Sequence, residues 1–267
     1  MTTTFADLVV ADPVHRRYAQ MPSIPTDLMP VRRQDKMKLE PFLAPASEDE
    51  KYSSSFRVLC NVLSQYKVVT FVFSSVTQKW CHATAFSCLP NRYIMDPTKL
   101  VRYYAHGRFY WSNPRDSRTY MLVLDPLEMN FSVVKLLHDK LGSGCAVVDA
   151  GEARLGLLTL GHCNLTLDLY CKTLRNNVVC TEDWQHDKTI PFPDSNSRWP
   201  IMFVGAAEGY LLMEAHPIST NEQQPKERYF TLDLKTMLVE RMHLSDQSIS
   251  QAHMYASFPP PLSPPSI

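Results

Sequence analysis

The chain of 267 residues has little glycine and no net charge, and both shortages restrict what it can be. Only 8 residues are Gly, against 20 Pro. Lys and Arg together number 27, as do Asp and Glu, so the formal net charge is zero. A neutral chain has no global field that attracts nucleic acid or an anionic lipid surface. We therefore expect neither nucleic acid nor a membrane among its partners.

Paired cysteines and long apolar runs are also missing. The 7 Cys are irregularly spaced, and none forms the CxxC pair typical of zinc and redox motifs. No apolar stretch approaches the ~18 residues of a membrane helix. The first residues lack the basic start of a secretory signal. We expect a soluble protein of the cytoplasm or nucleus, with reduced thiols and with no metal site or cofactor.

Motifs that carry catalysis are not found either. The chain contains no GxSxG, HExxH, P-loop or GxGxxG pattern. The pairs His138-Asp139 and His186-Asp187 lie in polar segments, and we interpret both as solvated strand ends. His162-Cys163 is interpreted as part of a loop. We expect no catalytic residues and a chain that is not an enzyme.

What the chain does contain is one repeated hairpin pattern. A β-branched apolar run is followed by a short polar turn and then by a strand that opens on a large residue. The five runs and their anchors are Leu8–Asp12 with Tyr18, Val69–Ser74 with Trp80, Met121–Asp125 with Phe131, Leu165–Cys171 with Trp184, and Tyr229–Asp233 with Val239. Successive anchors are about 50 residues apart, a spacing typical of propeller blades. The first step is longer because it contains a Pro-rich tract.

Further residues recur with the anchors. Gly107, Gly156 and Gly209 precede aromatic or leucine runs, where glycine permits a turn or a close backbone approach. The acidic residues Asp12, Asp125 and Asp233 end three of the apolar runs, and Asp-Pro at two of them favours a turn. Trp111 lies in the run after Gly107. We interpret all of these as structural residues of the repeat, and the aromatics as packing residues.

About four strands fit into each repeat. In one of them we expect strands over 100–104, 108–111, 119–124 and 130–134. Four short antiparallel strands are the size of one propeller blade. The prediction is an all-β propeller of about five or six kelch-like blades, the N-terminal one incomplete. A β-sandwich or a mixed α/β fold is the alternative, but a sandwich does not require this period.

We expect one domain over 1–258, with a Pro-rich and charged insertion or linker over 22–51. Residues 259–267 form a Pro-rich tail, because Pro removes backbone donors and fixes φ. Residues 252–258 are the expected C-terminal strand. Partner binding is expected on the rim loops, where the repeats differ. Those loops cover 113–117, 142–144, 194–199 and 219–228.

Several phrases together resemble the F-box-associated β-propeller domain of large plant families. They are LVVADPVHRRYAQMP, SSFRVLCNV, VVTFVFSSVTQKW, YYAHGRFYW, LVLDPLEMNFSVV, EDWQHDKTIPF and YASFPPPL, in the order that the family shows. Each phrase is weak alone, but together they span nearly the whole chain. The helical F-box that usually precedes this domain has no counterpart here, since an apolar strand is expected already from residue 8.

The resemblance implies a substrate-recognition propeller of an SCF-type ubiquitin ligase. Its partner would be an unidentified target protein, and the ligase adaptor would bind only if an F-box were supplied upstream. A stand-alone scaffold or competitor that is not coupled to ubiquitylation is the second hypothesis. A propeller-fold glycosidase is the third, and it would need convergent carboxylates at the central channel.

Overall fold

The computed structural model describes thirteen stretches of the chain. They are residues 8–12, 16–25, 37–44, 55–87, 96–113, 120–136, 145–161, 166–175, 178–179, 183–193, 200–207, 209–215 and 228–242. The expected C-terminal strand over 252–258 and the tail lie outside them. Apart from one 3-10 turn, Pro97–Lys99, all regular structure in these stretches is β-strand.

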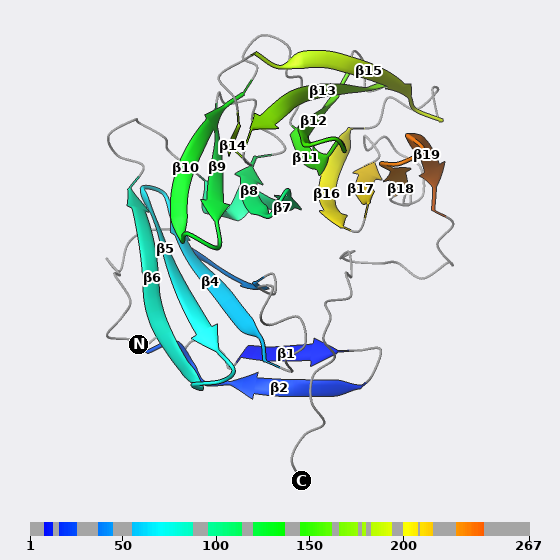
Figure 1. The fold of residues 1–267 in the computed structure, drawn as a ribbon. Helices are drawn as coiled ribbons and strands as arrows, with labels where there is room; N and C mark the ends of the chain where they lie inside the picture. Colours follow the sequence, from blue (N-terminus) through cyan, green and yellow to red (C-terminus); the bar gives the residue numbers. More distant parts are fainter. Residues whose placement is uncertain are drawn as a thin grey trace. The chain divides into compact units, whose positions relative to one another are not determined.

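The strands form antiparallel sheets in which neighbours follow one another along the chain (Figure 1). The first sheet is a hairpin of β1 (Leu8–Asp12) and β2 (Arg17–Met21). The second contains β3 (Met37–Leu43), β4 (Arg57–Ser64), β5 (Lys67–Ser74) and β6 (Lys79–Ser87). The third contains β7 (Val101–Ala105), β8 (Arg108–Ser112), β9 (Tyr120–Asp125) and β10 (Asn130–Lys135).

Two further sheets follow the same plan. One contains β11 (Cys145–Asp149), β12 (Arg154–Leu160), β13 (Thr166–Arg175) and β15 (Gln185–Pro191), with the two-residue β14 (Val178–Val179) beside β13. The other contains β16 (Ile201–Ala207), β17 (Tyr210–Ala215), β18 (Arg228–Asp233) and β19 (Leu238–Arg241).

The predicted all-β propeller-type fold with four-stranded blades is confirmed. The strands expected over 100–104, 108–111, 119–124 and 130–134 are β7 to β10, with bounds that differ by at most one residue. Five sheets occur in the described residues, within the expected range of blades, and the N-terminal sheet has two strands. The apolar runs are too short for helices and rich in β-branched and aromatic residues, which favour strands.

By contact, the chain forms two compact units. One comprises residues 1–98, 126–130 and 257–267, and the other comprises 99–125 and 131–256. In the second unit the first strands of its three sheets, β7, β11 and β16, contact one another. Its core is built from both faces of these sheets, with Leu155, Leu157 and Leu158 of β12 fully buried. Near-continuous burial of this kind is typical of sheets covered on both faces.

The other unit has a core of its own. One face of the β3–β6 sheet supplies Val58, Cys60, Phe71, Phe73 and Trp80. Leu8 and Val10 of the N-terminal hairpin pack against this cluster, together with buried Met21. The hairpin therefore has one face covered by apolar side chains of its own unit.

Part of the segment 22–51, which we expected to be an insertion or linker, is the strand β3. Leu39 and Phe42 give this stretch apolar side chains, and it pairs with β4 from Met37↔Ser64 to Leu43↔Val58. Pro41 is tolerated because β3 is the edge of its sheet, where a missing backbone donor removes no ladder bond on the outer side.

The repeat anchors occupy equivalent places in the last strand of each sheet. Trp80, Phe131 and Val239 are each the second residue of β6, β10 and β19, and each is the one buried residue of that strand. Trp184 is buried directly before β15. Tyr18 holds the same place in β2 but is 65% exposed, so it does not pack like the others. The anchors are therefore packing residues in every sheet except the N-terminal hairpin.

One turn geometry sets these positions. The register pairs Ala11↔Tyr18, Phe73↔Trp80 and Leu232↔Val239 span the same number of residues. The residue before the last strand has a positive φ in four sheets: Arg16 at 54°, Gln78 at 56°, Met129 at 51° and Met237 at 58°. A left-handed residue that closes a four-residue turn costs backbone strain, but it returns the chain in register.

One of the acidic repeat residues, Asp233, caps this turn in the last sheet. In β18–β19 the Asp233 carboxylate accepts hydrogen bonds from the backbone N–H of Lys235 (2.8 Å) and Thr236 (3.2 Å). These two donors hold the pKa of Asp233 below its ordinary value. Ser74 does the same for the β5–β6 turn with its hydroxyl, which accepts from Val76 N–H at 3.3 Å. Asp12 and Asp125 end β1 and β9 at the corresponding position.

Two anchor tryptophans also tie their strand to the preceding sheet. The indole N–H of Trp80 donates to the carbonyl of Pro22, just after β2, at 2.7 Å. That of Trp184 donates to the carbonyl of Lys135, at the end of β10, at 3.2 Å. The same type of bond thus joins consecutive repeats twice, which explains why tryptophan rather than phenylalanine occupies these places.

The glycine markers separate into two roles. Gly107 and Gly209 have φ of 77° and 83° in the turns between the first and second strands. Gly156 instead lies inside β12, where a Cβ would come 2.7 Å from Val148 Cγ2. The turn glycine of that sheet is Gly151, with φ of 73°. The expected equivalence of the three markers therefore fails at Gly156, because its turn is longer.

We predict that Gly156→Ala destabilises the protein by about 1–3 kcal/mol, since Val148 is buried and β-branched and has little freedom to move away. Gly205→Ala is the matched control, because a Cβ at Gly205 of β16 meets nothing within 4 Å. Urea unfolding of both variants measures the difference. Equal losses would show that the close approach at Gly156 is unimportant.

Removing the turn acceptor with Asp233→Ala is expected to lower the melting temperature at about pH 7 and to lower it by less at about pH 3. The reason is the lowered pKa of Asp233 in the folded state. A lowered carboxyl pKa stabilises above the unfolded-state pKa, and this stabilisation is lost as the pH falls through the folded-state pKa. Asp233→Asn keeps an acceptor and serves as the control. A loss that is the same at both pH values would contradict this account.

Candidate functional site

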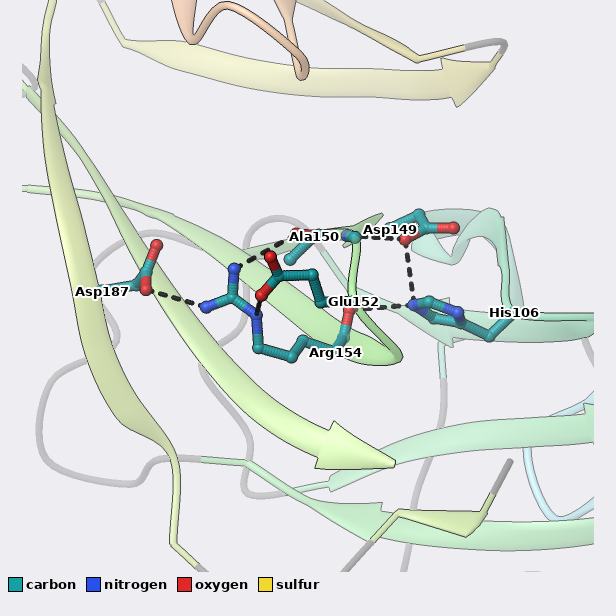
Figure 2. A network of polar contacts seen from close by, with 7 residues as sticks. His106, Asp149, Ala150, Glu152, Arg154 and Asp187 are labelled. Carbon is teal, nitrogen blue, oxygen red and sulfur yellow. Dashed lines mark hydrogen bonds and ion pairs between the residues drawn. The ribbon is translucent and has the colours of Figure 1, made fainter. Parts of the chain in front are cut away.

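A polar network joins two neighbouring sheets of the second unit at the end where their tight turns lie. It starts in the two-residue turn between β7 and β8, where His106 and Gly107 have φ of 49° and 77°. Two successive positive φ angles are typical of a type I′ hairpin. Figure 2 shows the imidazole of His106 pointing toward Asp149.

The Nε2 atom of His106 has two acceptors. It lies 2.9 Å from the carbonyl oxygen of Arg154 and 3.1 Å from Asp149 Oδ1. Because both partners only accept, this nitrogen carries the proton that is shared between them. Only 12% of the His106 side chain is exposed. The imidazole therefore fastens the β7–β8 turn to the next sheet.

The turn between β11 and β12 holds the acceptors in place. Asp149 Oδ1 also accepts from the backbone N–H of Gly151 at 2.8 Å. Gly151, Glu152 and Ala153 all have positive φ, at 73°, 51° and 54°. Consecutive left-handed residues that are not glycine are rare, and they persist only where surrounding contacts determine them.

Arg154 connects this turn to the last strand of the same sheet. Its Nη1 donates to Asp187 Oδ1 at 3.0 Å, its Nη2 lies 3.5 Å from the carbonyl of Ala150, and Nε lies 3.8 Å from Glu152 Oε2 (Figure 2). The hydrogen bond to Asp187 raises the pKa of Arg154 above its ordinary value. The guanidinium thus remains charged.

A β-bulge aims Asp187 at this arginine. β13 and β15 pair Leu169↔Lys188 and Tyr170↔His186, which leaves Asp187 as the extra residue. Bulges redirect side chains in this way without changing the faces of their neighbours. His186 consequently belongs to a different cluster: its Nε2 lies 3.1 Å from Thr189 Oγ1, and that hydroxyl donates to Asp168 Oδ1 at 2.6 Å.

The pair His186-Asp187, expected to be a solvated strand end, does lie at the start of β15, but each member has a partner of its own. His138-Asp139 and His162-Cys163 lie outside the described residues. Burial raises the pKa of Cys171, close to Arg154, to about 11. Its thiol stays protonated near neutral pH, so it does not supply a nucleophile to the network.

The network offers hydrogen-bond acceptors to a ligand. The Glu152 side chain is 86% exposed, and those of Asp149 and Asp187 are exposed in part. Arg154 offsets part of this negative charge. In the described stretches no group of three or more His, Cys, Asp or Glu residues is placed to hold a metal ion. Nor is there, in the same stretches, a helix long and apolar enough to cross a membrane.

The repeat residues do not converge on this network. Trp111 and the anchors other than Tyr18 are buried in the cores of separate sheets. The expected rim loops fall outside the described residues except for Asn113 and Arg228. Of the expected repeat residues, only Gly107 lies next to the network. His106, Asp149, Arg154 and Asp187 were not expected to form a site.

One recurring residue, an arginine, was not identified from the sequence. The second strand of three sheets begins with arginine: Arg57 in β4, Arg108 in β8 and Arg154 in β12. Arg108 binds Asp125 with Nη2–Oδ2 at 2.9 Å. The fourth such strand, β17, begins with Tyr210. These arginines recur at about the repeat spacing in the sequence. Because Arg is common on protein surfaces, only the strand bounds reveal that the three positions are equivalent.

Comparison with known proteins shows no family for this chain. No protein-family model matches the chain, and no curated protein matches it. Solved structures with a similar arrangement include the hydrazine synthase of Kuenenia stuttgartiensis, with TM-score 0.42 and 11% identity over 90% of this chain and 60% of that one. A lectin of Aleuria aurantia has TM-score 0.41 and 8% identity over 78% and 61%.

A third is an endo-arabinase of Bacteroides thetaiotaomicron, with TM-score 0.38 and 12% identity over 84% of both chains. This chain thus spans about three fifths of the length of the lectin and of the hydrazine synthase. The expectation that the chain is not an enzyme is corrected by these findings, since two of the three similar structures are enzymes. A sheet architecture of this kind is no ground for excluding catalysis.

We predict that His106→Ala destabilises the protein by about 1–2 kcal/mol, because Asp149 and the Arg154 carbonyl lose a shared donor. His186→Ala, which removes the imidazole of the more exposed cluster, is the matched control. Chemical unfolding at neutral pH compares the two variants. A loss at His106 no larger than that at His186 would contradict the role of His106 in joining the sheets.

Proposed function

We propose that the chain recognises a target protein through the connections at the end of its sheets that lies opposite the tight turns. The difference between the two ends of the β7–β10 and β16–β19 sheets is the observation that carries this proposal. In the third sheet, the turns at 106–107 and 126–129 lie at one end, and the connection 113–119 lies at the other. In the last sheet, the turns before β17 and β19 contrast in the same way with 216–227.

This division suits recognition for a physical reason. Short turns, held by side-chain acceptors and ion pairs, fix the register of the strands, while longer connections supply varied side chains for binding. The expected rim loops 113–117 and 219–228 belong to these longer connections, as do 142–144 and 194–199, which lead from one sheet to the next. All four therefore belong to the same end of their sheets.

For the cellular role, we propose the substrate-recognition part of an F-box-type ubiquitin ligase. The support for this role is the ordered set of phrases that resemble the F-box-associated domain, from residue 8 to residue 262. In this role the chain binds the target, and an F-box supplies the adaptor contact. A stand-alone scaffold would bind the same target without leading to ubiquitylation.

The target-binding end is tested by replacing residues 219–227 with a Gly-Ser segment of equal length. We expect proteins captured by the wild-type chain to be lost with this variant. They should be retained with Glu152→Lys, which changes the tight-turn end at a largely exposed side chain. Thermal unfolding confirms that both variants are folded. Capture that survives the loop replacement and fails with Glu152→Lys would contradict the proposal.

The ligase role needs a separate experiment. An F-box fused upstream of residue 1 should allow a reconstituted ligase to ubiquitylate the captured protein, and the loop replacement should abolish this product. The unfused chain should inhibit the reaction by competing for the target. Capture without ubiquitylation in the fused form would favour the scaffold role instead.

A further inference from the structure

Two of the outer strands carry the same short motif, in which a histidine follows the anchor tryptophan by two residues. Each histidine lies opposite an aromatic residue of the third strand and contacts its ring in a T-shaped arrangement. A β-bulge follows at the next residue in both strands. The motifs are Trp80-Cys81-His82 in β6, with His82 on Phe71, and Trp184-Gln185-His186 at the start of β15, with His186 on Tyr170.

The two histidines are both exposed, but they differ in their polar contacts. Nε2 of His186 lies 3.1 Å from Thr189 Oγ1, and that hydroxyl donates to Asp168 Oδ1 at 2.6 Å. Nε2 also lies 3.6 Å from the same carboxylate oxygen. His82 has its ring contact with Phe71 and, within the described stretches, no hydrogen-bond or ion-pair partner. Only one of these two equivalent imidazoles is therefore held by a hydroxyl and a carboxylate.

These contacts determine which nitrogen of His186 carries the proton. An ionised carboxylate only accepts, so the Thr189 hydroxyl gives its single proton to Asp168. The Thr189 oxygen can then only accept from the ring, which places the proton of the neutral imidazole on Nε2. Nδ1 is left with a free lone pair. Because 47% of the His186 side chain is exposed, solutes can reach the ring.

We propose that His186 is a nucleophilic site that takes acyl groups from activated esters, with Thr189 and Asp168 as its positioning residues. The imidazole is held from two sides, by the Thr189 hydroxyl and by the buried Tyr170 ring at a centroid distance of 5.2 Å. A reactive side chain that is oriented by a second group, which a third group orients in turn, is the arrangement used in nucleophilic catalysis. This activity does not depend on target binding.

The reaction has two steps. In the first, the Nδ1 lone pair attacks the acyl carbon, and the bond from that carbon to the leaving oxygen breaks, which releases an alkoxide or phenolate. The acyl group is then bound to Nδ1, and the ring carries a positive charge. The Asp168 carboxylate, 3.6 Å from Nε2, stabilises this charge directly and through the Thr189 hydroxyl.

In the second step, water adds to the acyl carbon, and the bond between this carbon and Nδ1 breaks. The carboxylic acid leaves, and one proton passes to the released alkoxide or phenolate. The neutral ring with its proton on Nε2 is restored. The sum is the hydrolysis of one ester by one water molecule, and no other reactant is needed.

Acylation is tested on the full chain with diethyl pyrocarbonate, followed by mass spectrometry of its peptides. We expect His186 to be labelled roughly fivefold faster than His82, which corresponds to about one net hydrogen bond. His82 is the internal control, because it has the same place in its sheet and the same type of ring contact. In Thr189→Val, labelling of His186 should slow to the rate of His82, and His82 should be unaffected.

Turnover is tested with p-nitrophenyl acetate. His186→Gln should remove most of the hydrolysis by the chain, and His82→Gln should leave it unchanged. Asp168→Asn keeps an acceptor for Thr189 but removes the charge, so it should slow hydrolysis without moving the ring proton. Nitrogen NMR of the imidazoles should show the proton on Nε2 in the wild type and in Asp168→Asn, and a mixture of tautomers in Thr189→Val. Circular dichroism establishes that the variants are folded.

Several results would overturn the proposal. Equal labelling of His82 and His186 would show that the Thr189 and Asp168 contacts do not affect reactivity. A ring proton on Nδ1 in the wild type would remove the free lone pair. An acetyl group that stays on His186 without release, or hydrolysis that persists in His186→Gln, would exclude the two-step reaction at this residue.

Discussion

The turn that returns the chain from the third strand to the fourth is the constraint on which the repeats depend. Its left-handed last residue and its side-chain cap at the first position fix the register of the hairpin. A slip of one residue would move every side chain of the fourth strand to the opposite face. Phe131 and Val239 would then leave the core, and their strands have no other buried residue to replace them. Strain at one residue per turn is thus offset by the burial of the anchor two residues later.

Much of this arrangement could be predicted from the sequence. The period of the anchors and the short apolar runs predict four-stranded units, and β7 to β10 lie within one residue of the expected bounds. These signals are local, since each anchor and its turn lie within a few residues of one another. The role of Gly156 could not be predicted from the sequence, because close backbone approach and a turn both favour glycine, and only the position relative to Val148 separates them.

The polar network could not be predicted in the same way. His106, Arg154 and Asp187 come from three segments, and each looks ordinary in its own segment. Their meeting depends on the neighbouring position of two sheets and on one extra residue in β15. The strand β3 was missed for another reason: its proline and nearby charges indicate a linker unless the strand is known to be an edge. The expectation that the chain is not an enzyme was wrong because it rested on the absence of sequence motifs. Only some catalytic chemistries have a recognisable motif.

The bulge at Asp187 bears on how such a molecule acquires new surface chemistry. Lys188 and His186 keep their partners Leu169 and Tyr170 on either side of the extra residue. An extra residue at this point therefore leaves the pairing of its neighbours unchanged and places one carboxylate at the tight-turn end of the sheet. An outer strand that tolerates a single insertion is a site where variation adds charge without risking the core. Repeats of this construction can diverge in their outer strands while their inner strands remain alike.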